Sequence, residues 1–258
     1  MKIGVLQGRL TPPSRGHYQE FPDEWFSEFE AAESMGLCGV EWLITKDYNF
    51  NNPIYNQFEE IKKLPVLSIC VDTLVDTRIT NKDFLSFNLI NLCKTIEGSP
   101  VSVLTIPILD DSDLNDDAAR ALFCEAIVPI GKTFPSVKFA FEAEMYPEKL
   151  NDIIHLCDNF YVTYDTGNIT SCGVSHNEFI TFFGDKIINV HLKDRTYDRK
   201  TVSPTMGDTD FDFIFRKLSE IGYSGPFILQ TARASNGKEF NTIKKHKELF
   251  EEIHEKYF

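Results

Sequence analysis

The chain has 258 residues, of which 42% are hydrophobic and 25% charged, an ordinary globular composition that can bury a large core. With 39 acidic and 26 basic residues, its formal net charge of −13 argues against a nucleic-acid partner and against attraction to anionic membrane surfaces. Apolar runs stay well below the roughly 18 residues of a membrane span, and the first ends too early for a signal peptide, so we expect a cytoplasmic protein.

Short runs rich in β-branched and apolar residues recur along the whole chain and are typical of buried strands. The eight predicted strands cover residues 3–7, 39–44, 66–72, 101–107, 137–142, 160–165, 187–193 and 226–230. Between them, apolar residues recur at helical spacing over residues 24–35, 84–96, 116–134, 211–221 and 239–257. Most of the six cysteines fall inside apolar runs, without a Cys-x-x-Cys pair, so we expect free core thiols rather than disulfides or a zinc knuckle.

The alternation of strand and helix predicts parallel β-α units. Eight units in 258 residues average about 32 residues each, which fits an α/β fold with one closed (β/α)8 TIM barrel. The competing open, doubly wound sheet usually carries a glycine-rich loop after its first strand, and the segment from Gln7 to Thr11 is not one. Neither a linker nor a low-complexity segment interrupts the sequence, so we expect a single domain over residues 1–258.

Polar side chains end four consecutive strands in the second half of the predicted barrel. The period of two in strand 137–142 points Glu142 toward the barrel axis, and Asp165, His191 and Gln230 end the next three strands. Two carboxylates, one imidazole and one neutral amide oxygen suit Mg²⁺, Mn²⁺, Co²⁺ or Zn²⁺. The sequence therefore predicts one divalent metal ion held by these four residues together, although for either carboxylate taken alone a helix N-cap is the commoner role.

Several segments, in chain order, resemble the xylose isomerase-like TIM barrel family, the sugar-phosphate isomerase and epimerase group that also includes endonuclease IV. They are Gln7-Gly8-Arg9-Leu10, Gly39-Val40-Glu41-Trp42, Phe139-Ala140-Phe141-Glu142, Asp165-Thr166-Gly167-Asn168, Val190-His191-Leu192-Lys193-Asp194-Arg195 and Met206-Gly207-Asp208-Thr209-Asp210-Phe211. The resemblance implies a divalent metal bound by Glu, Asp, His and Glu residues on strands five to eight.

The chain departs from the family pattern at two positions. Gln230 stands where the family has the strand-eight Glu, and Asn168 stands where a His often follows the strand-six Asp. In two-base ketose 3-epimerases of this family the two glutamates face opposite sides of the substrate carbon, and glutamine cannot take up a proton at neutral pH. A one-base aldose–ketose isomerisation remains open, because a single carboxylate can move the proton on one face of a cis-enediol.

We therefore expect a metal-dependent isomerase or epimerase that acts on a sugar or sugar phosphate through a metal-stabilised enediolate. Glu142 is the expected base and ligand, with Glu144 as the base if Glu142 only binds metal, and Lys193 is expected to polarise the second oxygen. The predicted substrate contacts are Gln7, Arg9, Trp42, Asp72, Asn168, Asp194, Arg195 and Arg233. The first and last arginines among them would bind an anionic group such as phosphate, and the tryptophan would stack on the sugar or pack under a loop.

Two other functions stay open. One is a sugar-binding barrel with an altered site, which Gln230 motivates, and the other is a dehydratase that uses the same enolate chemistry on a keto-cyclitol. The endonuclease function of the wider family is excluded, because it needs a three-metal cluster with many histidines and only His191 of the six histidines ends a strand. The expected partner is a small-molecule sugar, without nucleic acid or membrane, and homo-oligomerisation stays open.

Overall fold

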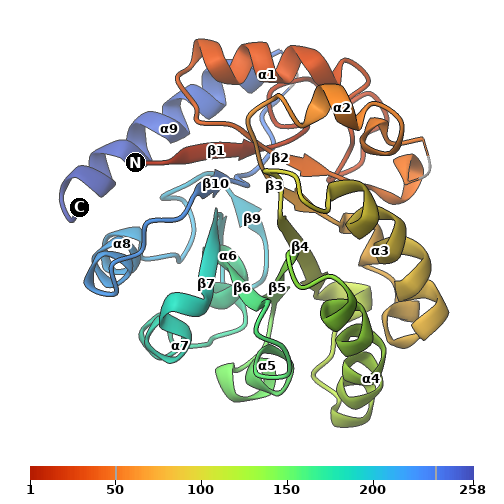
Figure 1. The fold of residues 1–258 in the computed structure, drawn as a ribbon. Helices are drawn as coiled ribbons and strands as arrows, with labels where there is room; N and C mark the ends of the chain where they lie inside the picture. Colours follow the sequence, from red (N-terminus) through yellow and green to blue (C-terminus); the bar gives the residue numbers. More distant parts are fainter. Residues whose placement is uncertain (50, 236) are drawn as a thin grey trace.

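The computed structural model describes residues 1–49, 51–235 and 237–258 of a closed barrel surrounded by helices (Figure 1). In these residues eight parallel strands pair in the order β1-β10-β7-β6-β5-β4-β3-β2. They are β1 (Ile3–Leu6), β2 (Val40–Leu43), β3 (Val66–Cys70), β4 (Val103–Ile108), β5 (Lys138–Ala143), β6 (Phe160–Asp165), β7 (Ile187–Leu192) and β10 (Phe227–Leu229). The predicted (β/α)8 barrel is therefore confirmed, and each predicted strand is present with ends within two residues.

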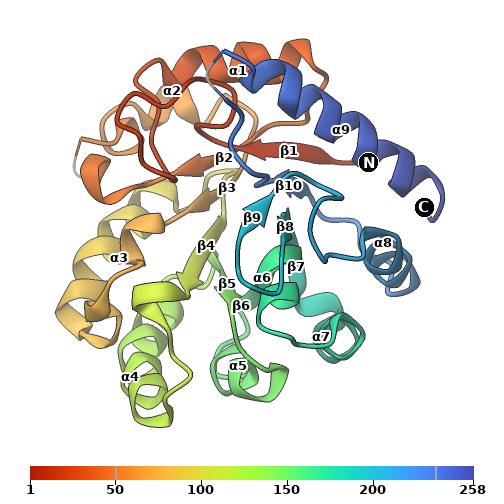
Figure 2. The same ribbon diagram turned by 180° about the vertical axis from the view of Figure 1, so that it is seen from behind.

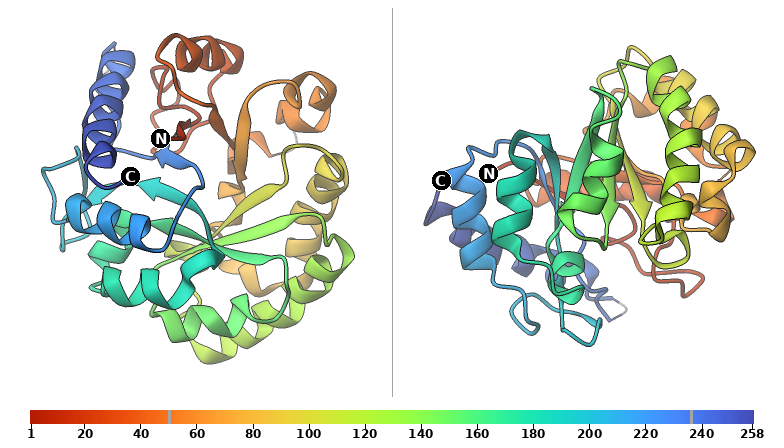
Figure 3. Two further views of the ribbon diagram at one scale, coloured as in Figure 1. Left: turned by 60° about the vertical axis from the view of Figure 1, so that its left-hand side comes forward. Right: turned by 90° about the horizontal axis from the view of Figure 1, so that it is seen from below.

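Helices cover the outside of the barrel on all sides (Figures 1 and 3). They are α1 (Trp25–Ser34), α2 (Phe58–Ile61), α3 (Lys82–Ile96), α4 (Asp117–Thr133), α5 (Pro147–Ile154), α7 (His176–Phe183), α8 (Phe211–Glu220) and α9 (Glu239–Glu255). The short helix α6 (Thr166–Ser171) lies instead at the end of β6, near the centre of Figure 1. The five predicted helices correspond to α1, α3, α4, α8 and α9. Among the described residues, no helix is both long enough and apolar enough to cross a membrane.

The strands bury two different faces. On the outer face, aromatic side chains pack between strands and helices, as where Phe141 contacts Phe123 of α4 with ring centroids 6.0 Å apart. On the inner face, Leu6, Cys70 and Ile228 form a small apolar cluster with Leu43 inside the barrel. This alternation is the one that the period of two predicts, and it turns Glu142 inward from β5. All six cysteines are free thiols, and the expected core position holds for Cys70 and Cys93, whereas Cys38 is exposed and the other three are partly buried.

A short antiparallel hairpin follows β7 at the carboxyl end of the barrel. It consists of β8 (Asp194–Arg195) and β9 (Thr201–Val202), and Figure 2 shows it lying in front of the barrel. The carboxylate of Asp194 anchors the chain beyond this hairpin, because its two oxygens accept hydrogen bonds from the backbone N–H groups of Gly207 at 2.9 Å and Thr209 at 3.2 Å. The hairpin is thereby held over the ends of β6 and β7.

Candidate functional site

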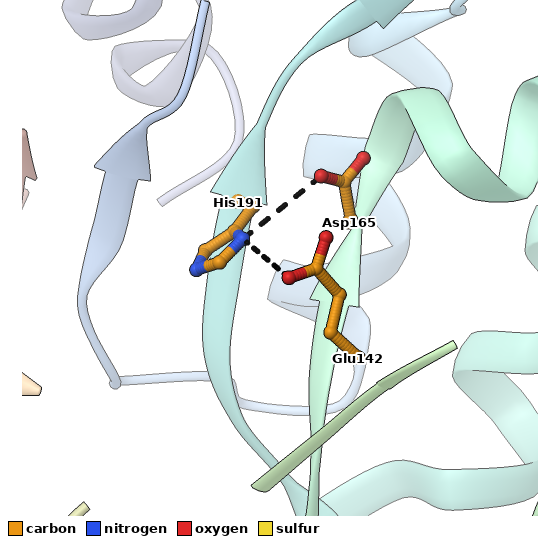
Figure 4. Close-up of side chains that lie close together, drawn as sticks. All are labelled: Glu142, Asp165 and His191. Carbon is orange, nitrogen blue, oxygen red and sulfur yellow. Dashed lines mark ion pairs between the residues drawn. The ribbon is translucent and has the colours of Figure 1, made fainter. Parts of the chain in front are cut away.

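Three buried side chains from neighbouring strands meet at the carboxyl end of the barrel: Glu142 from β5, Asp165 from β6 and His191 from β7 (Figure 4). Nδ1 of His191 lies 3.5 Å from Oε2 of Glu142 and 3.9 Å from Oδ2 of Asp165. One ligand atom from each residue lies within 4.8 Å of the others, which is a spacing that a single metal ion could bridge. The sequence predicts these three residues at one site, and the structure brings them together.

The opposite nitrogen of the His191 ring faces a residue that the sequence analysis did not select. Nε2 of His191 lies 2.8 Å from Oε1 of Glu41, which comes from the middle of β2, and both side chains are fully buried. Burial lowers the pKa of His191, but Glu41 and Glu142 together raise it well above its usual value. Burial would likewise raise the pKa of Glu41, but His191 holds it below its usual value. In the sequence, Glu41 could have been recognised as a carboxylate inside the otherwise apolar run Val40-Glu41-Trp42-Leu43.

Lys193 brings a positive charge to the same group of carboxylates. Its ammonium nitrogen lies 3.3 Å from Oδ2 of Asp165, 3.2 Å from Oε1 of Gln230 and 3.2 Å from Oδ1 of Asn168. Burial lowers the pKa of Lys193, whereas Asp165 and Glu142 raise it, and the net shift is upward. Gln230, which we predicted as the fourth metal ligand, therefore presents its amide oxygen to this ammonium group.

Asn168 and the backbone fix the orientation of the two carboxylates. The side-chain amide of Asn168 donates to Oε1 of Glu142 at 2.8 Å, and its backbone N–H donates to Oδ1 of Asp165 at the same distance. Asp165 is thus also the N-cap of α6. One carboxylate oxygen caps the helix, and the other faces His191. Although burial raises the pKa of Glu142, His191 and Lys193 hold it below its usual value. The Glu142 carboxylate is therefore ionised at neutral pH.

Glu144 lies on the wall of the site in a pair of salt bridges. One carboxylate oxygen lies 2.5 Å from Nη1 of Arg195, and the other contacts the guanidinium of Arg199. Arg195 also donates to Oδ1 of Asn168 at 2.9 Å. The predicted alternative base and the predicted substrate contact Arg195 are therefore paired with each other.

Two cavities adjoin the site, and Lys193 lines both of them. The inner one has a volume of about 110 Å³ and is lined by Cys70, Asp72, Glu142, Lys193 and Gln230 together with residues of the first and fourth β-α loops. The outer one has a volume of about 550 Å³ and extends past Glu144, Asn168 and Arg195 to the β9 strand of the hairpin. Burial, followed by the charge of Glu142, raises the pKa of Asp72 to about 6. Glu142 and Asp72 therefore line the inner cavity, and the outer cavity beside it has room for a small molecule.

Two predicted substrate contacts have structural roles instead. The Trp42 ring is fully buried outside the barrel beside Phe21 and Trp25, and its Nε1–H donates to Oδ1 of Asn52 at 2.8 Å. Residues 41 and 42 point to opposite faces of β2, so the side chain that faces the barrel interior is the glutamate. The predicted stacking of Trp42 on a sugar is therefore corrected to a core role, and Asp194 is the loop anchor described above.

The remaining predicted contacts hold the first β-α loop. Arg9 is buried and donates to the carbonyl of Thr231 at 3.2 Å, and Arg233 donates to the carbonyl of Gly8 at 2.6 Å. Burial lowers the pKa of both, that of Arg233 to about 10. The side-chain oxygen of Gln7 accepts from the backbone N–H of Leu43 at 3.0 Å. The two arginines join the first loop to the segment after the last barrel strand. An anionic substrate group would have to displace these backbone carbonyls in order to bind the guanidinium groups.

Comparisons with known proteins agree with this architecture. The model of a family described as xylose isomerase-like TIM barrel matches residues 88–253, whereas no curated protein matches the sequence. A solved structure of an IOLI protein with a bound zinc atom is 17% identical, with a TM-score of 0.73 over 100% of this chain and 99% of that chain. A D-tagatose 3-epimerase-like protein is 18% identical (TM-score 0.72, 99% of both chains), and an L-ribulose 3-epimerase is 14% identical (TM-score 0.74, 98% of this chain and 94% of that chain). At these identities the likeness shows the shared fold.

Proposed function

The chain belongs to the xylose isomerase-like TIM barrel family, and from this premise we propose that it isomerises or epimerises a sugar or sugar derivative at the carboxyl end of its barrel. The observation that carries the proposal is the buried group of Glu142, Asp165 and His191, whose ligand atoms lie within 4.8 Å of one another beside a cavity. Proteins that share this fold include an L-ribulose 3-epimerase, a D-tagatose 3-epimerase-like protein and an IOLI protein with bound zinc, and these relatives support the same class of chemistry.

The three residues fit a divalent cation. Their two carboxylates balance its charge, and Nδ1 of His191 is a buried nitrogen that has no hydrogen-bond partner among the described residues. The donor set of oxygen and imidazole nitrogen suits Mn²⁺, Mg²⁺, Co²⁺ or Zn²⁺. When bound, the cation would supply Lewis-acid chemistry, polarising the substrate carbonyl and lowering the pKa of the neighbouring C–H group.

We assign the proton transfer to Glu142. Its carboxylate is ionised, lines the inner cavity, and is oriented by the 2.8 Å hydrogen bond from Asn168. One carboxylate can take a proton from one substrate carbon and return it to the neighbouring carbon, which converts an aldose into a ketose without a second base. The charged ammonium of Lys193 lines the same cavity and stabilises the negative charge that develops on the substrate oxygen.

An epimerisation at a single carbon requires a second proton-transferring group in the site. A second acid must deliver a proton from the other side, and the amide of Gln230 cannot do so. Asp72 lines the same inner cavity with a pKa of about 6 and is the acid that we assign to that step. We therefore favour a one-base isomerisation, with Asp72 as the acid that an epimerisation would require.

Deuterium incorporation tests this function. The protein, supplied with Mn²⁺, is incubated in D₂O with free and phosphorylated ketoses and keto-cyclitols, and the substrate C–H signals are followed by proton NMR. We expect exchange of one C–H in at least one compound, and its loss in Glu142→Gln with an unchanged far-UV circular dichroism spectrum. Exchange at the wild-type rate in that variant would remove Glu142 from the role of base, and loss of water from a keto-cyclitol would identify a dehydratase.

A sugar-binding barrel without turnover is the second candidate. It is favoured by the ammonium group of Lys193, which lies between Asp165 and Gln230. In the wider family the position of Gln230 is a metal-binding glutamate, so here a positive charge lies where a metal ligand would be expected. Calorimetric binding of a sugar from the same panel, without any deuterium incorporation, would identify this function.

A further inference from the structure

A layer of polar side chains crosses the barrel interior directly beneath the candidate metal centre. Oε2 of Glu41 accepts hydrogen bonds from the hydroxyl of Ser68 at 2.5 Å, the amide of Asn189 at 2.8 Å and the hydroxyl of Thr105 at 3.2 Å. The Thr105 hydroxyl is in turn 3.2 Å from that of Thr163. These residues come from five different strands and are at most 1% exposed. The layer is therefore a hydrogen-bonded network with a carboxylate at its centre.

This layer is not what the stability of a barrel requires. The interior of a (β/α)8 barrel is normally filled by Val, Ile and Leu, and this barrel uses such residues in the cluster of Leu6, Leu43 and Ile228. Burying a carboxylate costs free energy unless it is paired and fully hydrogen-bonded. The three donors to Oε2 offset part of that cost, and the second oxygen, Oε1, is left for one further partner.

That partner is His191. Oε1 of Glu41 lies 2.8 Å from Nε2 of His191 in a fully buried ion pair, and the side-chain amide of Asn189 lies 3.3 Å from the same ring nitrogen. Nδ1, on the other side of the ring, lies 3.5 Å from Oε2 of Glu142 and 3.9 Å from Oδ2 of Asp165. The ring is thus held through one nitrogen and presents the other to the two carboxylates.

We propose that Glu41 is a positioning residue that holds the His191 ring and thereby sets the affinity of the site for a divalent cation. The proposal rests on the proposed function in assuming that Glu142, Asp165 and His191 bind such a cation. Partners that hold the second nitrogen of a metal-binding histidine typically change metal affinity by about 10- to 100-fold. Glu41 does not line the described cavities, so this effect is separate from contact with substrate.

Titration with Mn²⁺ followed by electron paramagnetic resonance tests the proposal in the full-length protein. We expect Glu41→Gln to weaken Mn²⁺ binding by about 10- to 100-fold, because a neutral amide holds the Nε2 proton less strongly. Glu28→Gln is the matched control. Glu28 is equally buried, but it accepts hydrogen bonds from the backbone of Gly8, Leu10 and Thr11 rather than from His191, so its Mn²⁺ affinity should stay within about twofold.

A second readout separates positioning from general destabilisation. In the Zn²⁺-loaded wild-type protein, the Nε2 proton of His191 should give a downfield NMR signal with slow solvent exchange, and Glu41→Gln should shift this signal and speed its exchange. If Glu41→Gln does not fold, Ser68→Ala removes one hydrogen bond to Glu41 and should weaken Mn²⁺ binding about threefold or more. Thr163→Val alters the same layer without touching Glu41 and should leave the affinity unchanged.

The outcomes are distinguishable. Wild-type Mn²⁺ affinity in a folded Glu41→Gln protein, or in Ser68→Ala when that variant is needed, would overturn the positioning role while leaving the proposed function intact. Equal weakening in Glu41→Gln and Glu28→Gln would also overturn it, because the loss would then be a general consequence of removing a buried charge. Absence of Mn²⁺, Co²⁺ and Zn²⁺ binding by the wild-type protein would overturn the metal-dependent function itself.

Discussion

At the scale of single residues, the candidate site is a balance of buried charges. Glu41, Glu142 and Asp165 carry negative charge, and His191 and Lys193 lie between them within 4 Å. Charges this close interact strongly where water is excluded. When Nδ1 of His191 loses its proton to bind a metal ion, the ring becomes neutral. The three carboxylates are then balanced by only one positive charge, the ammonium group of Lys193, so the site attracts a cation.

The Lys193 ammonium and a divalent cation should compete for the same carboxylates. We expect Lys193→Met to tighten Mn²⁺ binding by about tenfold or more, because a like charge a few ångströms away costs more than 1 kcal/mol. The same change should lower kcat about 100-fold, since a charge that stabilises the developing oxyanion is lost. Lys200→Met is the control, because Lys200 lines only the outer cavity and pairs with Asp198 at 2.7 Å. Unchanged Mn²⁺ affinity in Lys193→Met would rule out the competition.

Asp72 should make the stability of the protein depend on pH. Its pKa is raised to about 6 in the folded state, first by burial and then by Glu142, so the folded chain binds its proton more tightly than the unfolded chain does. Stability from this group is therefore lost as the pH rises from about 4 to above 6. We expect Asp72→Asn to raise the free energy of unfolding by about 1–3 kcal/mol above pH 7, and by roughly a third of that gain at pH 4.5. Thermal unfolding in EDTA measures this, and an equal gain at both pH values would point to packing instead of ionisation.

The sequence was sufficient for part of this site. Glu142, Asp165 and His191 end their strands, and the period of two in each strand fixes the face on which they lie. Glu41 was not predicted, because a carboxylate in the middle of a strand is tolerable only when distant strands supply donors such as Ser68 and Asn189. The salt bridges of Glu144 depend in the same way on where the loop after β7 folds back.

At the scale of elements, long periodic segments could be predicted and short ones could not. The helices α1, α3, α4, α8 and α9 span 10 to 17 residues each, long enough to show the helical period. The helices α2, α5, α6 and α7 have 4 to 8 residues, too few to separate a helical period from a loop. The two-residue strands β8 and β9 carry no periodicity, and their pairing depends on contacts with residues further along the chain.

The hairpin β8–β9 should depend on Asp194. Asp194→Asn replaces one of the two acceptors of the Gly207 and Thr209 N–H groups by an amide donor in a fully buried place. We expect a loss of about 2–3 kcal/mol in the free energy of unfolding and at least tenfold faster tryptic cleavage after Arg199 or Lys200. Mass spectrometry locates the cut. Asp208→Asn, which removes one exposed hydrogen bond to the backbone of Tyr197, should have a much smaller effect, and equal cleavage in the two variants would contradict the anchoring role.

At the scale of the whole molecule, the first and last strands close the barrel. Ile3 pairs with Phe227 and Val5 with Leu229, while Arg9 and Arg233 connect the first loop to the end of the last strand. Both termini consequently lie near each other (Figure 3). We therefore propose that residues 1–258 form one cooperative domain, since no part of the barrel can open without breaking the pairing on both of its sides.

This closure leads to a prediction about unfolding with bound metal. Consider a cation that binds only the folded chain and is present at a free concentration of 100 times its Kd. It adds about 2.7 kcal/mol to the free energy of unfolding, which for a chain of this size raises Tm by roughly 5–10 °C. We expect Mn²⁺ to produce this shift equally in far-UV circular dichroism, which reports the whole barrel, and in the fluorescence of Trp25 and Trp42, which lie far from His191 along the sequence. Glu142→Gln should lose most of the shift. Two separate transitions, with Mn²⁺ moving only one of them, would contradict a single domain, because the metal-binding strands would then unfold apart from the amino-terminal ones.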